Sequence, residues 1–209
     1  MIIRTLTLLA GFSCLLLAAD PVANTQHQDF AAGGTILLKN STGELTIEGW
    51  DQPGVEITTV KSGKRSDDVK VTASRDGTEL VIATDYPRHR RFLPRPSVGA
   101  RDFELEYLVK VPRGAKVVVD HDAGEIHFDG LTGDIHATMN QGTITVRLPV
   151  ASQYSLDAKA RIGDVTSDIP GTKTRMHFGH ALLQTAPAAQ SLYLRTGFGD
   201  IIVLREPRQ

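Results

Sequence analysis

The residues with the clearest capacity for chemistry are arginines gathered in one short segment. Residues 86–101 read YPRHRRFLPRPSVGAR and contain no carboxylate. The arginines of this segment are Arg88, Arg90, Arg91, Arg95 and Arg101. Guanidinium groups bind phosphate and carboxylate oxygens through paired hydrogen bonds, so the segment predicts a binding site for an anionic polymer or for lipid head groups.

The same segment also has a second interpretation, as a solvated loop between two strands without a binding function. Its prolines, Pro87, Pro94 and Pro96, exclude a regular strand or helix through its middle. Such a loop would only keep a sheet edge soluble, and this is the interpretation that we favour. Phe92 and Leu93 keep the binding hypothesis open, because an apolar pair has little reason to lie in a purely solvated loop.

A second group of side chains has the chemistry of zinc ligands, which are imidazoles and carboxylates. Its members are Asp120, His121, Asp122, Glu125, His127, Asp129, Asp134 and His136. If two of the repeat units described below form one turn, His127 and His136 lie on different faces and cannot share a metal ion. His177 and His180 flank a Phe-Gly pair typical of a turn. No metal site is therefore predicted.

Enzymatic chemistry has little support in the sequence. Motifs of serine hydrolases, phosphate-binding loops, zinc proteases and dinucleotide-binding domains are absent, so we predict neither a catalytic residue nor a cofactor. The alternative is a polysaccharide lyase or glycosidase on a β-solenoid, and a glycosidase needs two carboxyl groups roughly 5 to 10 Å apart. If alternate units share a face, Glu125 lies beside Thr143 while Asp134 lies opposite, which is a poor catalytic cluster.

The composition describes an ordinary globular chain. It has 209 residues, 41% hydrophobic and 22% charged, with a net charge of -1. These values exclude a disordered chain, and the lack of a basic excess argues against nucleic acid as a partner. The length suits a single domain with a buried core.

The first 19 residues have the layout of a secretory signal peptide. Arg4 precedes an apolar run over 6–17, and small residues up to Ala19 provide a cleavage site. The run is shorter than the roughly 20 residues of a membrane-spanning helix, so no span is expected after cleavage. An uncleaved anchor and a lipoprotein acylated at Cys14 are the alternatives. The sequence thus predicts an exported protein without disulfides.

The remaining chain alternates apolar and polar residues at period two, which predicts an all-β fold. We expect a loose segment over 20–29 and a single all-β domain over 30–205. Within this domain, 30–111 is strand-rich and 112–205 contains a repeat.

The repeat is a glycine followed by a polar residue and then by alternating aliphatic residues. Its units begin at Gly124, Gly133, Gly142, Gly163 and Gly199, with an outlying unit at Gly43. A unit of about nine residues holds one short strand and a corner, so the pattern predicts a β-solenoid or β-helix-like repeat. If two units form one turn, each coil takes about 18 to 20 residues and the strands stack on two faces.

The alternation within each unit assigns side chains to the core or to solvent. The residues expected inside are Ile126, Phe128, Ile135, Ala137, Ile144, Val146, Ile201 and Val203. Those expected outside are Glu125, His127, Asp134, His136, Thr143 and Thr145. Trp50, the only tryptophan, ends the unit of Gly43 and is expected to cap a strand edge, with a carbohydrate-stacking platform as the alternative.

Several of these stretches together resemble a known family. They are NSTGELTIEGW at 40–50, VEITTVKSG at 55–63, ELVIATDYP at 79–87, YLVKVPRGAKVVV at 107–119 and the GEIHFDGLTGDI run. Their order and spacing over residues 30–204 resemble the "putative adhesin" domain family of bacterial exported proteins. The resemblance implies a β-solenoid-like fold and a setting in the cell envelope, in the periplasm or at the cell surface of a bacterium, and it implies no catalytic residue. We therefore expect a structural or binding protein, with a scaffold or sensor of envelope maintenance as a further alternative.

Overall fold

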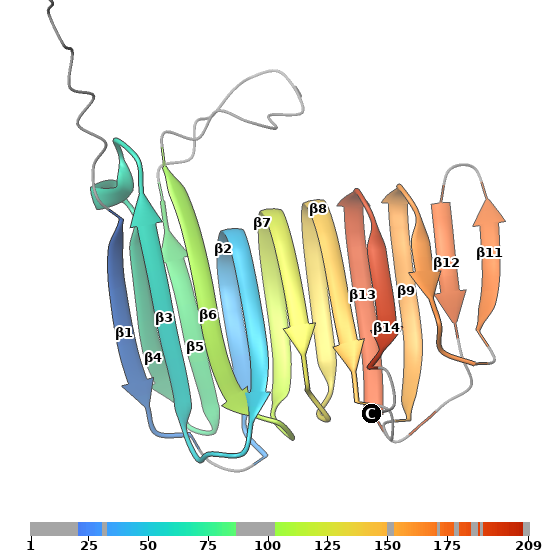
Figure 1. Ribbon diagram of the computed structural model, residues 1–209, viewed down its shortest axis with the longest axis horizontal. Coiled ribbons are helices and arrows are strands. Elements are labelled where there is room, and N and C mark those ends of the chain that lie inside the picture. Colours follow the sequence, from blue (N-terminus) through green and yellow to red (C-terminus); the bar gives the residue numbers. More distant parts are fainter. Residues whose placement is uncertain are drawn as a thin grey trace, which may run out of the picture.

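The computed structural model describes residues 21–30, 33–86, 103–149, 153–170, 172–177, 180–184, 188 and 190–206. These residues form strands and a single turn of 3-10 helix, η1 (Ser66–Asp68) (Figure 1). The strands are β1 (Val22–Gln28), β2 (Thr35–Trp50), β3 (Val55–Ser62), β4 (Lys70–Asp76), β5 (Glu79–Asp85), β6 (Glu104–Pro112), β7 (Lys116–Asp129), β8 (Ile135–Leu148), β9 (Tyr154–Ile162), β10 (Val165–Ser167), β11 (Lys173–His177), β12 (His180–Gln184), β13 (Gln190–Phe198) and β14 (Ile201–Arg205). The predicted all-β class is confirmed.

All strands belong to one hydrogen-bonded sheet, which folds over on itself. Strands β2, β7 and β8 are long. The first and second halves of β2 pair with β5 and β6, and those of β8 pair with β13 and β14, whereas β7 lies between β2 and β8 along both of its halves. The first halves lie in the row β4-β5-β2-β7-β8-β13-β9-β12-β11, which we name the β4–β11 layer. The second halves lie in the row β1-β3-β6-β2-β7-β8-β14-β10, the β1–β10 layer.

The two layers face each other across one core. Ile36 and Leu38 of the first half of β2, and Leu45 and Ile47 of its second half, have no exposed surface and belong to one apolar cluster. Thr84 of β5 and Tyr107 of β6 lie in different layers, yet their hydroxyl oxygens are 2.6 Å apart and buried. In Figure 1, β4 and β5 accordingly lie behind β3 and β6.

The stacking of the repeat differs from the expected one. Gly124 pairs with Gly142 and Val117 with Ile135, each 18 positions on in the sequence, within the expected length of a coil. However, β13 pairs with both β8 and β9, so the rungs follow the order β2, β7, β8, β13, β9. A solenoid wound in chain order would place β9 against β8. The structure therefore shows a single folded sheet. Strands that share the same spacing of glycines and the same alternation of buried residues can fit at more than one position in such a sheet.

The predicted orientation of side chains is confirmed in the core. All eight residues expected inside are buried, each with at most 1% of its surface exposed. Outside, Glu125 is exposed, whereas Thr143 and Thr145 are half-buried rather than exposed. Thr145 lies between His127 and Ile202 of the adjacent strands, and these neighbours cover it.

The layers join at a stack of glycines, which we name the glycine ladder: Gly43, Gly124, Gly142, Gly199 and Gly163. A Cβ atom on Gly124 would lie 1.9 Å from the carbonyl oxygen of Gly43, and one on Gly142 would lie 1.8 Å from that of Gly124. Both glycines have φ of 132°, which disfavours any other residue. Gly133, predicted to head a unit, lies elsewhere, against the Ala115 carbonyl.

The segment expected to be loose contains a strand. Residues Val22–Gln28 form β1, which pairs antiparallel with β3 along its whole length. Most of its side chains are exposed, so the segment lacks the apolar alternation by which a strand is predicted. The predicted signal peptide lies outside the described residues, and no helix within them is long and apolar enough to cross a membrane.

Candidate functional site

The outer face of the β1–β10 layer carries a row of glutamates on three adjacent strands. Glu44 of β2 pairs in register with Glu106 of β6 on one side and with Glu125 of β7 on the other. Neighbouring strands are about 4.8 Å apart, so these carboxylates form a compact acidic row. Sequence reasoning missed Glu44 and Glu106 as partners of Glu125. Gly43 marks Glu44 as the equivalent of Glu125, but no local signal places β6 beside β2.

The acidic row adjoins the base of the arginine-rich segment. An open hollow is lined by Thr42, Gly43, Glu44, Phe103, Glu104, Leu105 and Glu106. Phe103 immediately follows the part of the chain that contains the arginines, and Tyr86 precedes it. The Tyr86 and Phe103 ring centroids are 5.9 Å apart, and the Tyr86 hydroxyl donates to Asp122 Oδ2 over 2.9 Å. The two ends of the segment are thus held side by side.

The predicted ligand-binding arginines Arg88, Arg90, Arg91, Arg95 and Arg101 lie outside the described residues. Only the two residues that flank them, Tyr86 and Phe103, are placed, and both are largely buried. The anionic-ligand site therefore stays a prediction.

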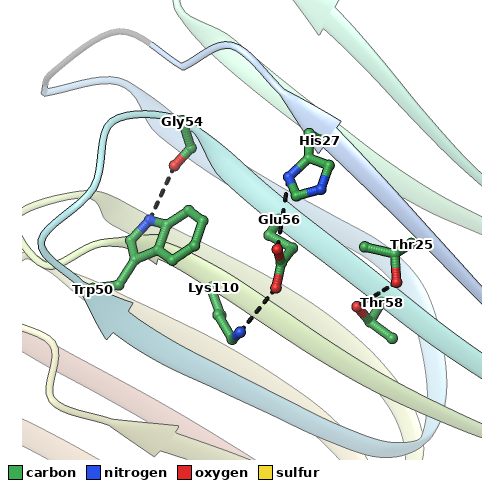
Figure 2. Close-up of polar contacts among 7 residues, drawn as sticks. All are labelled: Thr25, His27, Trp50, Gly54, Glu56, Thr58 and Lys110. Carbon is green, nitrogen blue, oxygen red and sulfur yellow. Dashed lines mark hydrogen bonds and ion pairs between the residues drawn. The ribbon is translucent and has the colours of Figure 1, made fainter.

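A polar network crosses β1, β3 and β6 on the same outer face (Figure 2). Lys110 Nζ donates to Glu56 Oε1 over 2.9 Å, and His27 Nδ1 lies 3.7 Å from Glu56 Oε2. The hydrogen bond from Lys110 lowers the pKa of Glu56, and the same bond raises the pKa of Lys110. On the neighbouring pair, the hydroxyl oxygens of Thr25 and Thr58 are 3.0 Å apart.

Trp50 lies beside this network and is held by its own turn. The indole Nε1 donates to the Gly54 carbonyl over 3.2 Å, and Lys110 Nζ lies 5.9 Å from the ring centroid. Figure 2 shows Trp50 at the end of its strand, with Gly54 and Lys110 close to it. These contacts fix the Trp50 side chain against its own turn and against β6. A sugar would stack on the face of the ring, so both the capping role and the carbohydrate platform stay predictions.

The histidines and carboxylates proposed as zinc ligands are dispersed. His121 is fully buried, with Nδ1 2.8 Å from Ser41 Oγ and Nε2 3.1 Å from the Gly43 carbonyl. Because a carbonyl oxygen only accepts, His121 Nε2 carries a proton. Asp122 binds Tyr86 and the side-chain amide of Asn140.

His127 and His136 lie on different layers, as expected for two units in one turn. His127 Nε2 is 3.2 Å from Glu125 Oε2 on the same strand. The His136 ring contacts the Tyr193 ring, with centroids 4.1 Å apart and the ring planes tilted by 47°, and burial together with nearby Lys116 and Arg195 lowers the pKa of His136. Within the described part of the chain, no group of three metal-ligating side chains converges.

The two carboxylates considered for an enzyme also lie as expected. Glu125 pairs with Thr143, while Asp134 belongs to the other layer and accepts hydrogen bonds from the backbone N–H and hydroxyl of Ser191. Asp134 is therefore a structural acceptor, whereas the acidic row gathers carboxylates from three adjacent strands.

Comparison with known proteins supports the fold. No protein-family profile and no curated protein matches the chain. A "putative cell adhesion protein" from Clostridium sporogenes has a similar structure, with a TM-score of 0.59, 14% identity, and coverage of 90% of this chain and 100% of that one. A "putative adhesin" from Bacteroides fragilis matches with a TM-score of 0.30 and 8% identity over 90% of this chain and 98% of the other. A "putative lipid binding protein" from Parabacteroides distasonis matches with a TM-score of 0.29 and 10% identity, over 90% of this chain and 98% of that one. Of these three, only the clostridial protein exceeds a TM-score of 0.5, and at its identity it shows a shared fold alone.

Proposed function

We propose that this chain is an exported, non-catalytic binding protein of adhesin-like type, which acts in the periplasm or on the cell surface. Its flat outer faces present side chains in register on adjacent strands, and such surfaces suit extended ligands better than small molecules. The fold shared with a protein named for cell adhesion is compatible with this role.

The proposed ligand is an anionic polymer of the envelope or the head groups of lipids, bound by Arg88, Arg90, Arg91, Arg95 and Arg101. The observation that carries this proposal is the contact between Tyr86 and Phe103, which holds the two ends of the arginine-rich segment together where β5 ends and β6 begins. A segment with a fixed base delivers its charges to one place, so several guanidinium groups can bind the same polyanion.

The test is binding of the purified protein to phosphatidylglycerol vesicles and to lipopolysaccharide at increasing salt. Affinity that rests on charge falls as the Debye length shrinks from about 10 Å at 0.1 M to about 3 Å at 1 M salt. Replacing Arg88, Arg90, Arg91 and Arg95 by serine should abolish binding to both ligands and leave thermal stability unchanged.

A matched control removes four cations from the outer face of the other layer. Lys39, Lys116, Lys159 and Arg161 are all exposed. Their replacement by serine lowers the net charge equally and should preserve binding. If the two quadruple variants lose affinity equally, net charge alone drives binding and the arginine-rich segment is not the site.

Export itself is tested by mass spectrometry of the protein recovered from its natural host. Cleavage of the proposed signal peptide places the N-terminus at or near Asp20. An N-terminus at Met1 contradicts cleavage, and an acylated Cys14 indicates a lipoprotein instead.

We also propose that the glycine-hinged strands are coils of a solenoid-type repeat. The 18-residue register between β7 and β8 supports this proposal, although the rungs are not filled in chain order. Deletion of residues 117–134, which removes a single coil, tests this proposal.

A second candidate function, carbohydrate cleavage, is favoured by one observation, the acidic row. Retaining glycosidases use two carboxyl groups about 5 to 5.5 Å apart, and adjacent parallel strands supply a similar spacing. Incubation of the protein with a glycan array separates the two functions. Hydrolysis that is lost in Glu44→Gln and Glu125→Gln identifies an enzyme, whereas retention of intact glycans identifies a binding protein.

A further inference from the structure

Strand β1 is an unusual edge strand. Among the described residues it pairs only with β3, so its other edge presents unpaired backbone N–H and C=O groups. Its sequence, VANTQHQ, contains no Lys, Arg, Asp, Glu or Pro. Proteins normally protect edge strands from pairing with other chains by means of charges, prolines or very short strands.

The other edge strands of the described sheet have this protection. Strand β4 contains Lys70, Arg75 and Asp76, and β11 contains Lys173 and Arg175. Strand β10 is protected by its length of only three residues. In the described sheet, β1 alone combines length, neutrality and an open edge.

The position of β1 leaves room for an incoming strand. Three strands, β6, β3 and β1, extend the β1–β10 layer beyond β2, whereas only β5 and β4 extend the other layer. Strand β1 therefore projects one strand beyond the second layer, and it forms the left end of the molecule in Figure 1. Consistent with this projection, 55% of the surface of Val22 is exposed.

We propose that β1 pairs antiparallel with β1 of a second copy of this chain, so that the β1–β10 layers of two molecules form one continuous sheet. An antiparallel pair of identical strands obeys two-fold symmetry, which is the commonest symmetry of homodimers. Only a register centred on Thr25 pairs all seven residues of the strand. In this register Thr25 lies opposite Thr25 of the second copy, and every opposed pair is free of like charges.

The side chains of this register are compatible across the interface. Val22 lies opposite Gln28, Ala23 opposite His27, and Asn24 opposite Gln26 of the second copy. Opposed residues in an antiparallel pair point to the same face, so the outer faces of the two molecules are continuous. The second copy covers the exposed Val22 at each end of the paired strands.

The expected dimer is weak, because pairing of one short strand buries less than the roughly 1,200 Å² of a stable interface. Sedimentation velocity of the purified protein from about 1 µM to about 1 mM should show a reversible monomer–dimer equilibrium within this range. A protein that is monomeric at every concentration would overturn the proposal.

Thr25→Lys provides the decisive variant, because it places two like charges opposite each other at the two-fold axis. We expect the dimer to dissociate at least tenfold more readily. Thr58→Lys is the matched control, since it adds the same charge to the same face and breaks the same Thr25–Thr58 hydrogen bond, one strand further inside. Thr58→Lys should dimerise like the natural chain, and circular dichroism of both variants verifies that they fold.

A charge-reversed partner tests the register. Thr25→Lys and Thr25→Glu should each be monomeric alone and should form a heterodimer when mixed, because position 25 meets itself only in the proposed pairing. If Thr25→Lys dimerises as well as the natural chain, or if the mixture stays monomeric, the dimer uses another surface and the proposal is wrong.

Discussion

Lys110 has two neighbours of different chemical character, the Glu56 carboxylate and the face of the Trp50 indole. The carboxylate contact depends on pH, whereas the ring contact does not change while the lysine stays charged. One side chain thus links β6 both to β3 and to the corner at the end of β2 (Figure 2).

This difference leads to a prediction for Lys110→Met. Because the pKa of folded Glu56 is lowered, the ion pair stabilises the fold above the ordinary carboxyl pKa, and this contribution is lost as the pH falls through the lowered value. The variant should therefore be less stable than the natural chain at pH 7, and the difference should shrink in acid. In NMR titration, the pKa of Glu56 should rise toward its ordinary value.

Lys116→Met is the control for this titration, since it removes the same charge from the other layer. It should leave the pKa of Glu56 unchanged. A stability difference between Lys110→Met and the natural chain that is equal at pH 3 and pH 7 would show that the lysine acts through its contact with Trp50 alone.

Each long strand bends at a glycine, because glycine has no Cβ atom. Gly124, Gly142, Gly199 and Gly163 each approach the carbonyl oxygen of the adjacent glycine in the ladder, and Gly43 approaches that of Leu105, so no side chain fits between these strands. The ladder therefore fixes where every long strand passes from one layer to the other.

We expect Gly142→Ala to lower the free energy of unfolding by roughly 2 to 5 kcal/mol, from unfavourable backbone geometry and a forced shift of the ladder. A Cβ atom at Gly142 would lie 1.8 Å from the Gly124 carbonyl oxygen, whereas one at Gly114 would have no neighbour within 4 Å. Gly114→Ala should therefore change stability by less than about 1 kcal/mol. Urea denaturation measures both, and equal losses would contradict the ladder.

The elements were predictable where the pattern is local. Alternation predicted the buried faces of β7 and β8, because it follows from the geometry of a single strand. The repeated glycines predicted the bends at Gly124 and Gly142, but they also predicted one at Gly133, which lies against the Ala115 carbonyl instead. Strand β1 could not be predicted, since it is held by backbone pairing to β3 and its side chains are mostly exposed. The acidic row was missed for a related reason: Glu44 and Glu106 meet only through the pairing of β2 with β6, which the local sequence does not encode.

The whole molecule behaves as a stack of rungs with a common spacing. Deletion of residues 117–134 joins Lys116 to Ile135 and removes one register repeat, so β8 can take the place of β7 against β2. We expect the shortened chain to fold cooperatively, with a lower thermal midpoint. One cause is the loss of the Leu131 and Gly133 carbonyls that accept hydrogen bonds from Tyr154.

A shorter deletion is the matched control. Removal of residues 117–125 takes out half a repeat, namely the first half of β7 together with Gly124. The β4–β11 layer then loses one strand while the β1–β10 layer keeps all of its strands, so the two layers no longer match. That chain should lose its cooperative thermal transition in circular dichroism. If both deletions unfold the protein, the rungs are not interchangeable and the repeat describes the sequence only.

The order of the strands in the sheet determines when the sheet can be completed during folding. Strands β13 and β14 are near the end of the chain, yet they fill an interior rung between β8 and the pair β9 and β10. Strand β9 therefore has no permanent partner on that side until residues 190–205 have been synthesised. Contacts between such distant parts of a chain form slowly, because the closure of long loops precedes any gain from pairing. Assembly of this sheet consequently waits for residues 190–205, and a chain that stops before residue 190 has open edges at both β8 and β9.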